Sequence, residues 1–305
     1  MTTPTFERPL LPVATVDDAA ATCETIRPYV HGRTSEIVFV HVIERGNNYP
    51  AKAPLEAMED RATEIFDRVY DAFADDPNIV RTELRYASDV IEEIFTVADD
   101  VGASTVGFTP RPGNRLSKLL SRNRSRKLVA RSHRPVTVFP SPERNRLLLA
   151  ETTADPLLEA DGRDEILVPF DCSSEAETAL EYACMTHPGS AITTLHVVRK
   201  QGSGVYESMT GSPSSDYEEI EREERRAVDR LFERAKSIGA EHETSIETVT
   251  VIGSVANGVI TYAEQQDVEL IVLGRPGESS LSSRLLGSTT KTIIDGAPVA
   301  VTVVT

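Results

Sequence analysis

The sequence predicts an α/β protein made of two tandem domains, each a doubly wound parallel sheet. The first observation is an internal repeat, in which three strand-like segments recur in the same order with offsets of 155, 165 and 163 residues. The second is that strand-like and helix-like segments alternate in both halves. The third is that the strands are apolar on consecutive residues, as in parallel sheets that helices cover on both faces. The matched segments are Phe39–Ile43 with Thr194–Val198, Ala103–Gly107 with Val268–Val272, and Arg134–Val138 with Ala297–Val301.

The spacing of apolar residues assigns the elements of the second half in order. Short apolar runs predict strands, and apolar residues three or four positions apart predict helices. The expected strands are Ile166–Pro169, Ala191–Val198, Ser245–Val251, Val268–Leu273 and Pro298–Val304, and the expected helices are Ser174–Thr186, Tyr217–Ile238, Ala256–Gln265 and residues 288–295.

Each half contains one long helix with a clear apolar stripe. Gly239 follows the stripe of the second half, and we interpret it as the C-cap of that helix. The stripes consist of Leu55, Met58, Ala62, Ile65, Phe66, Val69 and Phe73 in the first half, and of Ile220, Val228, Leu231, Ala235 and Ile238 in the second.

The repeat divides the chain into a first domain at 1–145, a linker at 146–163 and a second domain at 164–305. Ligands of doubly wound sheets bind at the carboxyl ends of the strands, between the first and fourth strands. The last strands, Arg134–Phe139 and Pro298–Val304, are apolar edges that need cover. If they pair with each other, both are covered and the domains form an intramolecular pseudo-dimer. A further homodimer of two chains stays open.

The composition points to an acidic cytoplasmic protein. The chain has 305 residues, a formal net charge of −16, and 26 Arg but only 6 Lys. Scarce Lys with an acid excess suits a halophilic protein, because high salt screens self-repulsion; an ordinary acidic cytosolic protein is the alternative. Negative charge argues against nucleic-acid binding, which needs a basic surface. Residues 1–16 do not read as a signal peptide, and no apolar run is long enough for a membrane span.

Cysteines and histidines indicate no metal site. Cys23, Cys172 and Cys184 lack C-x-x-C spacing and an accompanying His cluster, so we interpret them as small buried apolar residues. His41 and His196 recur at matching strand positions, and we expect both to satisfy local polar groups.

A glycine pattern begins directly after the strand expected at Val268–Leu273. It reads Gly-Arg-Pro-Gly over 274–277, then nine residues, then Gly287-Ser288, or G-x-x-G-x₉-G-[ST]. Glycines at a strand end let backbone N–H groups approach an anion, and a helix that begins here points its N-terminus at the same place. The pattern therefore predicts a site for the phosphates and ribose of a nucleotide.

Several segments of the second half match one family pattern in order: Ile166–Asp171 with Ser173, Ala179-Leu180, Leu195–Val197, the glycine pattern and Pro298–Val301. Together they resemble the universal stress protein (UspA-like) family over about 165–305, and the first half resembles it more faintly over about 9–140. The resemblance implies Rossmann-like, adenine nucleotide alpha hydrolase-like domains. It also implies ATP binding, because family members with this glycine pattern bind ATP and members without it do not.

The resemblance further implies a role for each site residue. Asp171 would approach the ribose and phosphates, Val197 would meet adenine through its backbone, and Gly287 would help to cradle the phosphates. Asp171 has a second interpretation, which is to cap the following helix together with Ser173 and Ser174. The nucleotide-binding residues implied for ATP, with Mg²⁺, are Pro169, Asp171, Val197, Leu273, Gly274, Gly277, Gly287, Ser288 and Thr289.

The first half departs from this pattern. Ala14 stands where the second half has Asp171, with Asp17 and Asp18 as the nearest substitutes. Pro110 stands where the second half has Gly274, and residues 123–125 read Asn-Arg-Ser instead of the glycine and hydroxyl pair. We interpret the first half as a degenerate partner domain.

Three further features have alternative interpretations. The basic run 122–127, with Arg131 and Arg134, is either a solvated face paired with acids or a site for an anion or acidic partner. Arg275 and Arg284 flank the glycine pattern and offer charge to offset phosphates. The loop at 200–216 is either a lid over the nucleotide or a plain linker.

These observations predict a regulatory, nucleotide-sensing protein with one live ATP site, in the second domain. No nucleophile with a general base flanks the glycine pattern, so we expect no dedicated catalysis and at most weak ATP hydrolysis. An interaction module without nucleotide is the first alternative. An adenylating enzyme ranks lower, because neither an S-G-G-x-D-S loop nor an H-x-G-H element occurs. AMP or another adenine nucleotide remains open as the ligand.

Overall fold

The computed structural model describes residues 4–30, 32–45, 54–109, 129, 131–140, 165–198, 215–275 and 287–305, without the side chains of 215–221. Its strands are β1 (Pro9–Pro12), β2 (Ile37–Glu44), β3 (Val80–Ala87), β4 (Thr105–Phe108), β5 (Val136–Val138), β6 (Glu165–Pro169), β7 (Ala191–Val198), β8 (Ile246–Ile252), β9 (Leu270–Gly274) and β10 (Ala300–Val304). Its helices are α1 (Val16–Val30), α2 (Leu55–Ala72), the 3₁₀ turn η1 (Pro77–Ile79), α3 (Val90–Asp100), α6 (Ser174–Thr186), α8 (Ser215–Glu241), α9 (Val255–Gln265) and α10 (Ser288–Gly296).

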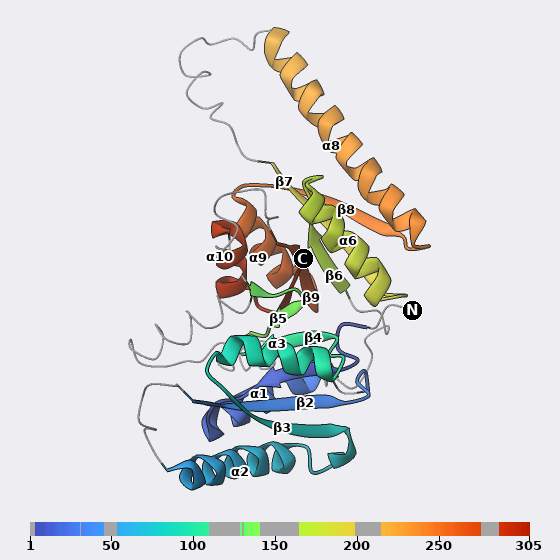
Figure 1. Ribbon diagram of the computed structural model, residues 1–305. Coiled ribbons are helices and arrows are strands. Elements are labelled where there is room, and N and C mark those ends of the chain that lie inside the picture. Colours follow the sequence, from blue (N-terminus) through green and yellow to red (C-terminus); the bar gives the residue numbers. More distant parts are fainter. Residues whose placement is uncertain are drawn as a thin grey trace.

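The described strands form one ten-stranded sheet in the order β3-β2-β1-β4-β5-β10-β9-β6-β7-β8 (Figure 1). Within each half the strands are parallel and follow the order 3-2-1-4-5, so the doubly wound α/β fold predicted from the sequence is confirmed. The halves meet where β5 and β10 pair antiparallel, with Thr137 opposite Thr302. This is the pairing predicted for the two final strands, and it places the C-terminus between the halves.

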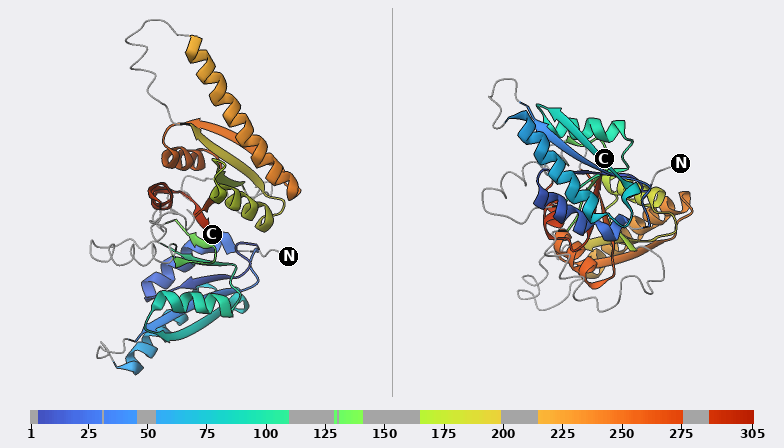
Figure 2. Two further views of the ribbon diagram at one scale, coloured as in Figure 1. Left: turned by 45° about the horizontal axis from the view of Figure 1, so that its top comes forward. Right: turned by 90° about the horizontal axis from the view of Figure 1, so that it is seen from below.

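Helices cover both faces of the sheet (Figure 2), and each face has its own apolar core. One core lies under α1, α2, α6 and α8 and includes Phe39, Phe139 and Ile166. The other lies under α3, α9 and α10 and includes Leu10, Leu167 and Ile271. Because side chains alternate along a strand, neighbouring apolar residues serve opposite cores, which explains why the strands read as continuous apolar runs.

Strand pairing corrects one detail of the repeat. Val136 pairs with Val106, and Val301 pairs with Ile271. Since Val106 and Ile271 are 165 residues apart, the last strands are also related by 165 residues, not by the predicted 163. Thr137 is therefore equivalent to Thr302, and the two face each other at the local two-fold axis between the halves.

Polar contacts accompany this junction. The hydroxyl of Thr137 lies 2.8 Å from that of Thr105 and 2.9 Å from that of Thr302, and all three side chains are buried. The ring of Tyr29 packs 5.2 Å from that of Phe139, and its hydroxyl accepts a 3.2 Å hydrogen bond from the amide of residue 300. A buried hydroxyl row between strands fixes their register, because a slip would leave each hydroxyl unpaired.

Gly239 does not cap α8, which continues to Glu241. The amide of Thr244 donates a 2.8 Å hydrogen bond to the Gly239 carbonyl, and the left-handed residue of the turn is Glu243, with φ of 54°. A Cβ at Gly239 would lie 2.6 Å from the Thr244 carbonyl oxygen and against Ile246. Its lack of a side chain thus lets β8 start directly beneath the end of α8.

The cysteine prediction holds for two of the three residues. Cys23 and Cys184 are buried, and burial raises the pKa of Cys23 to about 12 and that of Cys184 to about 11. Cys172 is exposed, which corrects the expectation, because it occupies the left-handed turn between β6 and α6 with φ of 62°. Among the helices that the structure describes, none has the length and apolar character that crossing a bilayer requires.

Candidate functional site

The candidate site lies at the carboxyl edge of the second half of the sheet. Strands β9, β6 and β7 are neighbours there, in that order. Pro169 ends β6 and Asp171 follows it, Val197 lies near the end of β7, and Leu273 and Gly274 end β9. The fold therefore brings these five predicted residues to one edge, at the switch point between the first and fourth strands of this half.

Asp171 is exposed and shapes the turn that leads into α6. Its Oδ1 accepts hydrogen bonds from the Ser173 amide at 3.0 Å and the Ser173 hydroxyl at 2.6 Å. Ser173 in turn caps α6, because its hydroxyl oxygen accepts a 3.2 Å hydrogen bond from the Ala176 amide. Asp171 thus supports the helix cap indirectly, through Ser173. Its Oδ2 has no hydrogen-bond partner within the described ranges. Burial, with Glu177 and Asp171 nearby, raises the pKa of the adjacent Cys172 thiol.

The two recurring histidines hold the same edge in each half. His196 Nδ1 lies 3.0 Å from the Phe170 carbonyl oxygen, and His41 Nδ1 lies 2.8 Å from that of Val13. Because a carbonyl only accepts, Nδ1 carries the proton in both rings. Each histidine therefore ties the loop after the first strand to the second strand, which confirms the local structural role predicted for them.

Gly274 is required by packing. A Cβ at this position would lie 2.8 Å from the Glu175 Cα and closer still to the Glu175 carbonyl group. These are backbone atoms of the first turn of α6, which cannot rotate away. The first glycine of the pattern therefore lets α6 approach the end of β9. Leu273 is 6% exposed with its side chain in the core, so its backbone is the part it can present to a ligand.

An open cleft of about 420 Å³ adjoins this edge between the first turns of α9 and α10. It is lined mainly by small and hydroxyl residues: Gly253, Ser254, Val255, Ala256, Ser288, Thr289 and Thr292. Neither helix has a side-chain hydrogen bond to its N-terminal amides from its N-cap residue, which is Ser254 for α9 and Gly287 for α10. Two helix N-termini and four hydroxyls thus face one space, an arrangement that favours an anion.

Sequence reasoning missed the α9 side of this cleft. The signal was present, because Gly253-Ser254 follows a strand and precedes a helix, as an N-cap does. Gly258 brings that helix close to the sheet, since a Cβ there would lie 2.9 Å from Val251 Cγ2 and 3.2 Å from Val197 Cγ2. The first turn of α9 therefore sits over the strand that carries Val197.

Part of the predicted site lies outside the described residues. Gly277, Arg284, the basic run 122–127, the first-domain Pro110, and nearly all of the 200–216 loop belong to this part, as does the linker at 146–163. Gly287, Ser288 and Thr289 are described and begin α10 as expected. Within the described ranges, no group of three or more His, Cys, Asp or Glu side chains has the geometry to hold a metal ion by itself.

The arginines near the pattern have protein partners. Arg275 Nη1 donates to the carbonyl oxygens of Val129 at 3.3 Å and Ser132 at 2.8 Å, both in the first half, so the predicted offset of phosphate charge is not its arrangement here. Arg131 pairs with Asp89 at 3.0 Å, and Arg134 pairs with Asp99. These pairs fit the solvated, acid-paired face predicted for this region.

The corresponding edge of the first half differs in chemistry. Asp18 is 8% exposed and its Oδ2 accepts a 2.8 Å hydrogen bond from the Ala14 amide, so it turns inward where Asp171 faces outward. Strand pairing makes Thr109, not Pro110, the equivalent of Gly274, since Phe108 pairs with Val138 as Leu273 pairs with Val303. Whether Thr109 or Pro110 is taken as the equivalent of Gly274, the first half has no glycine at this position.

Comparison with known proteins supports this picture of the second half. The model of the Universal stress protein family matches residues 162–305. Residues 162–305 form a universal stress protein domain. A universal stress protein of Methanocaldococcus jannaschii is 28% identical over 142 residues, which cover 43% of this chain and 87% of that relative.

Solved structures extend the likeness to both halves. A universal stress protein from Archaeoglobus fulgidus matches 99% of this chain and 97% of its own, with a TM-score of 0.62 and 20% identity. A putative universal stress protein from Pseudomonas aeruginosa matches 98% of this chain and 93% of its own, with a TM-score of 0.50 and 16% identity. At these identities the likeness establishes the fold, and it shows that the first half shares it with the universal stress protein domain.

Proposed function

We propose that the second domain binds an adenine nucleotide, ATP with Mg²⁺, and that the protein acts as a regulatory nucleotide sensor rather than an enzyme. The observation that carries the proposal is the cleft between the first turns of α9 and α10, because its hydroxyls and helix N-termini suit phosphate groups. The G-x-x-G-x₉-G-S pattern ends in this cleft, and Asp171 and the backbone at Val197 lie along the same edge of the sheet.

The residues present are chemically suited to the triphosphate. Ser288 and Thr289 lie in the first turn of α10, where backbone amides are unsatisfied within the helix, and Ser254 offers a hydroxyl from the opposite helix. Mg²⁺ usually keeps several waters and binds through phosphate oxygens and one or two carboxylates. Asp171 is an exposed carboxylate at this edge, and the hydrogen bonds described above go to its Oδ1. Any hydrolysis of the bound ATP is expected to be weak.

Calorimetric titration with Mg-ATP in high salt tests the proposal. Gly287→Val puts a branched side chain where the cleft begins, and we expect it to weaken binding by more than tenfold. Gly296→Ala is the matched control at the other end of the same helix, because its Cβ would meet the flexible end of Ile260. Equal affinity of all three proteins, or loss in the control as well, contradicts the proposed location. If the wild-type chain binds no adenine nucleotide, an interaction module becomes the better account.

In this proposal the first domain contributes no nucleotide site of its own. The inward-facing Asp18 and the threonine at 109 support that assignment. We further propose a cytoplasmic location without a role for membranes, and no binding of nucleic acids, which the acidic sequence disfavours. A homodimer of the whole chain is compatible with this function and is tested by sedimentation.

A further inference from the structure

We propose that Arg275 is a positioning residue through which the first domain sets the geometry of the nucleotide site in the second. The inference rests on the proposed function and concerns its regulation. The side chain of Arg275 reaches across the junction and donates from Nη1 to the carbonyls of Val129 and Ser132. Its backbone amide is held by the Val304 carbonyl oxygen at 2.8 Å. Both ends of this residue are therefore fixed.

Arg275 stands at the entry to the glycine pattern. Gly274, directly before it, is packed against the backbone of α6, and the chain continues from Arg275 toward Gly277 and Gly287. Because Arg275 is anchored in the first half, the direction in which the chain leaves β9 at the nucleotide edge depends on a segment of the other domain.

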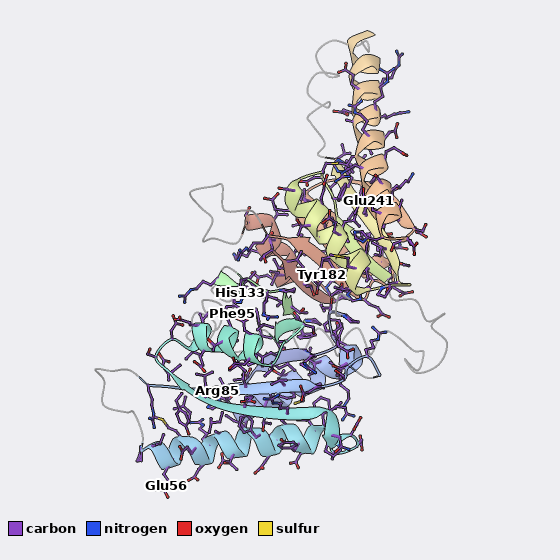
Figure 3. All side chains as sticks on the ribbon, turned by 45° about the vertical axis from the view of Figure 1, so that its right-hand side comes forward. Glu56, Arg85, Phe95, His133, Tyr182 and Glu241 are labelled. Carbon is purple, nitrogen blue, oxygen red and sulfur yellow. The ribbon has the colours of Figure 1, made fainter. Side chains whose placement is uncertain are left out.

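The segment that receives Arg275 is itself in contact with α3. Arg131 binds Asp89 at 3.0 Å, and Asp89 also caps α3 by accepting from the amides of Ile91 and Glu92. His133 lies 3.1 Å from Asp99. Its ring centroid is 5.5 Å from that of Phe95, with the two rings tilted by 55° (Figure 3). The carbonyls that accept from Arg275 thus belong to a segment of the first domain that contacts both ends of α3.

The acceptors also suit a cation. Both acceptors are backbone carbonyl oxygens, which only accept hydrogen bonds and carry partial negative charge. A guanidinium is always charged and forms strong hydrogen bonds with such groups. The counterpart of Arg275 by strand pairing is Pro110, which has neither an amide hydrogen nor a charged side chain. Pro110 cannot make the reciprocal contact. The contact of Arg275 therefore links the nucleotide site of the second domain to the degenerate first domain, and gives the first domain a function.

Another cross-domain pair provides a matched control. Arg33 binds Glu269 at 3.1 Å, with both side chains partly exposed. Glu269 precedes β9 and Arg275 follows it, so the two contacts lie at opposite ends of the same strand, roughly 20 Å apart at 3.3 Å per residue. Loss of the Arg33 pair weakens the junction without touching the nucleotide edge.

The test measures Mg-ATP affinity by calorimetry for the full chain and for Arg275→Gln, Arg33→Gln, Asp89→Asn and the double variant of residues 89 and 275. Asparagine at 89 keeps the oxygen that caps α3 but loses the charge that holds Arg131. We expect about tenfold weaker binding for Arg275→Gln, about threefold for Asp89→Asn, and less than twofold for Arg33→Gln. The double variant should bind no more weakly than Arg275→Gln alone, since both changes act through one segment.

Three outcomes overturn the inference while leaving the proposed function intact. If Arg33→Gln weakens binding as much as Arg275→Gln, the junction acts only through general stability. If Asp89→Asn has no effect, or the two changes add fully, Arg275 acts on the phosphates directly. If Arg275→Gln does not fold, the Mg-ATP affinity of Asp89→Asn decides: weaker binding supports the inference, and unchanged binding overturns it. Absence of nucleotide binding by the wild-type chain defeats the proposed function and the inference together.

Discussion

Replacing Gly274 with alanine is the sharpest structural perturbation that this fold offers. The new Cβ would lie 2.8 Å from the Glu175 Cα, whereas carbon atoms normally approach to about 3.5–4.0 Å. The first turn of α6 must therefore move by about 1 Å, and it carries backbone atoms that no rotamer change can relieve. Overpacking of this kind costs about 1–3 kcal/mol, and we expect the upper end, about 3 kcal/mol.

Urea unfolding followed by circular dichroism measures this cost. With an m-value of about 2 kcal/mol/M, an expected loss of about 3 kcal/mol lowers the midpoint by about 1.5 M. Gly296→Ala serves as the control, because its Cβ would meet only the flexible Cδ1 of Ile260 at 2.6 Å, and its stability should change by less than about 1 kcal/mol. If both variants unfold at the same urea concentration, the close approach of α6 to β9 is not what requires Gly274.

Three further predictions concern single side chains. His196→Ala removes the hydrogen bond to the carbonyl after β6 and should cost about 1–2 kcal/mol in urea unfolding; an unchanged midpoint contradicts its anchoring role. Arg134 and then His133 lower the pKa of Asp99, so this carboxylate contributes stability above its unfolded pKa of about 3.9, and that stability is lost as pH falls further. Asp99→Asn should reduce the pH dependence of the free energy of unfolding in this acidic range, and an unchanged pH dependence contradicts the pairing. Thr137→Val should lower the free energy of unfolding by about 1–2 kcal/mol, because it leaves the Thr302 hydroxyl unpaired. Changing Thr302 to valine as well should recover part of this loss, and strict additivity of the two changes argues against the buried hydroxyl row.

Most of the fold was predictable because its strands and helices follow simple periodicities. The boundaries of Ser174–Thr186 and Ala191–Val198 agree with the expected ones, since a serine cap begins the helix and a continuous apolar run defines the strand. The pairing of the final strands followed from two apolar edges that needed cover. The register of that pairing did not, because Pro135 and Pro298 align in the sequence while the sheet relates Val136 to Val301.

The site was predictable where one segment carries the signal and not where separate segments meet. Ser288 could be assigned from the glycine pattern, which lies within one stretch of sequence. Ser254 enters the cleft only because α9 and α10 begin side by side, which depends on packing. Likewise, Arg275 looked like a phosphate partner from its place in the pattern. Only the three-dimensional junction reveals that its guanidinium binds Val129 and Ser132.

Helix ends and turns were the other source of error. Gly239 followed a helical stripe and was predicted to cap it, yet the left-handed residue is Glu243. Cys172 was predicted to be buried and instead occupies a left-handed turn at the surface. In both cases the tertiary path of the chain, which brings β8 under α8 and turns β6 into α6, decided the conformation over local preference.

The number of adenine nucleotides that one chain binds tests the proposal of a single nucleotide site. Equilibrium titration of the wild-type protein with Mg-ATP in high salt, with the protein concentration well above the Kd, gives this number without any variant. We expect saturation at one ATP per chain, because the glycine pattern occurs only in the sequence of the second domain, and the hydroxyl-lined cleft found among the described residues lies in that domain too. Saturation at two would contradict the degenerate first domain, and no saturation at all would contradict the nucleotide site itself.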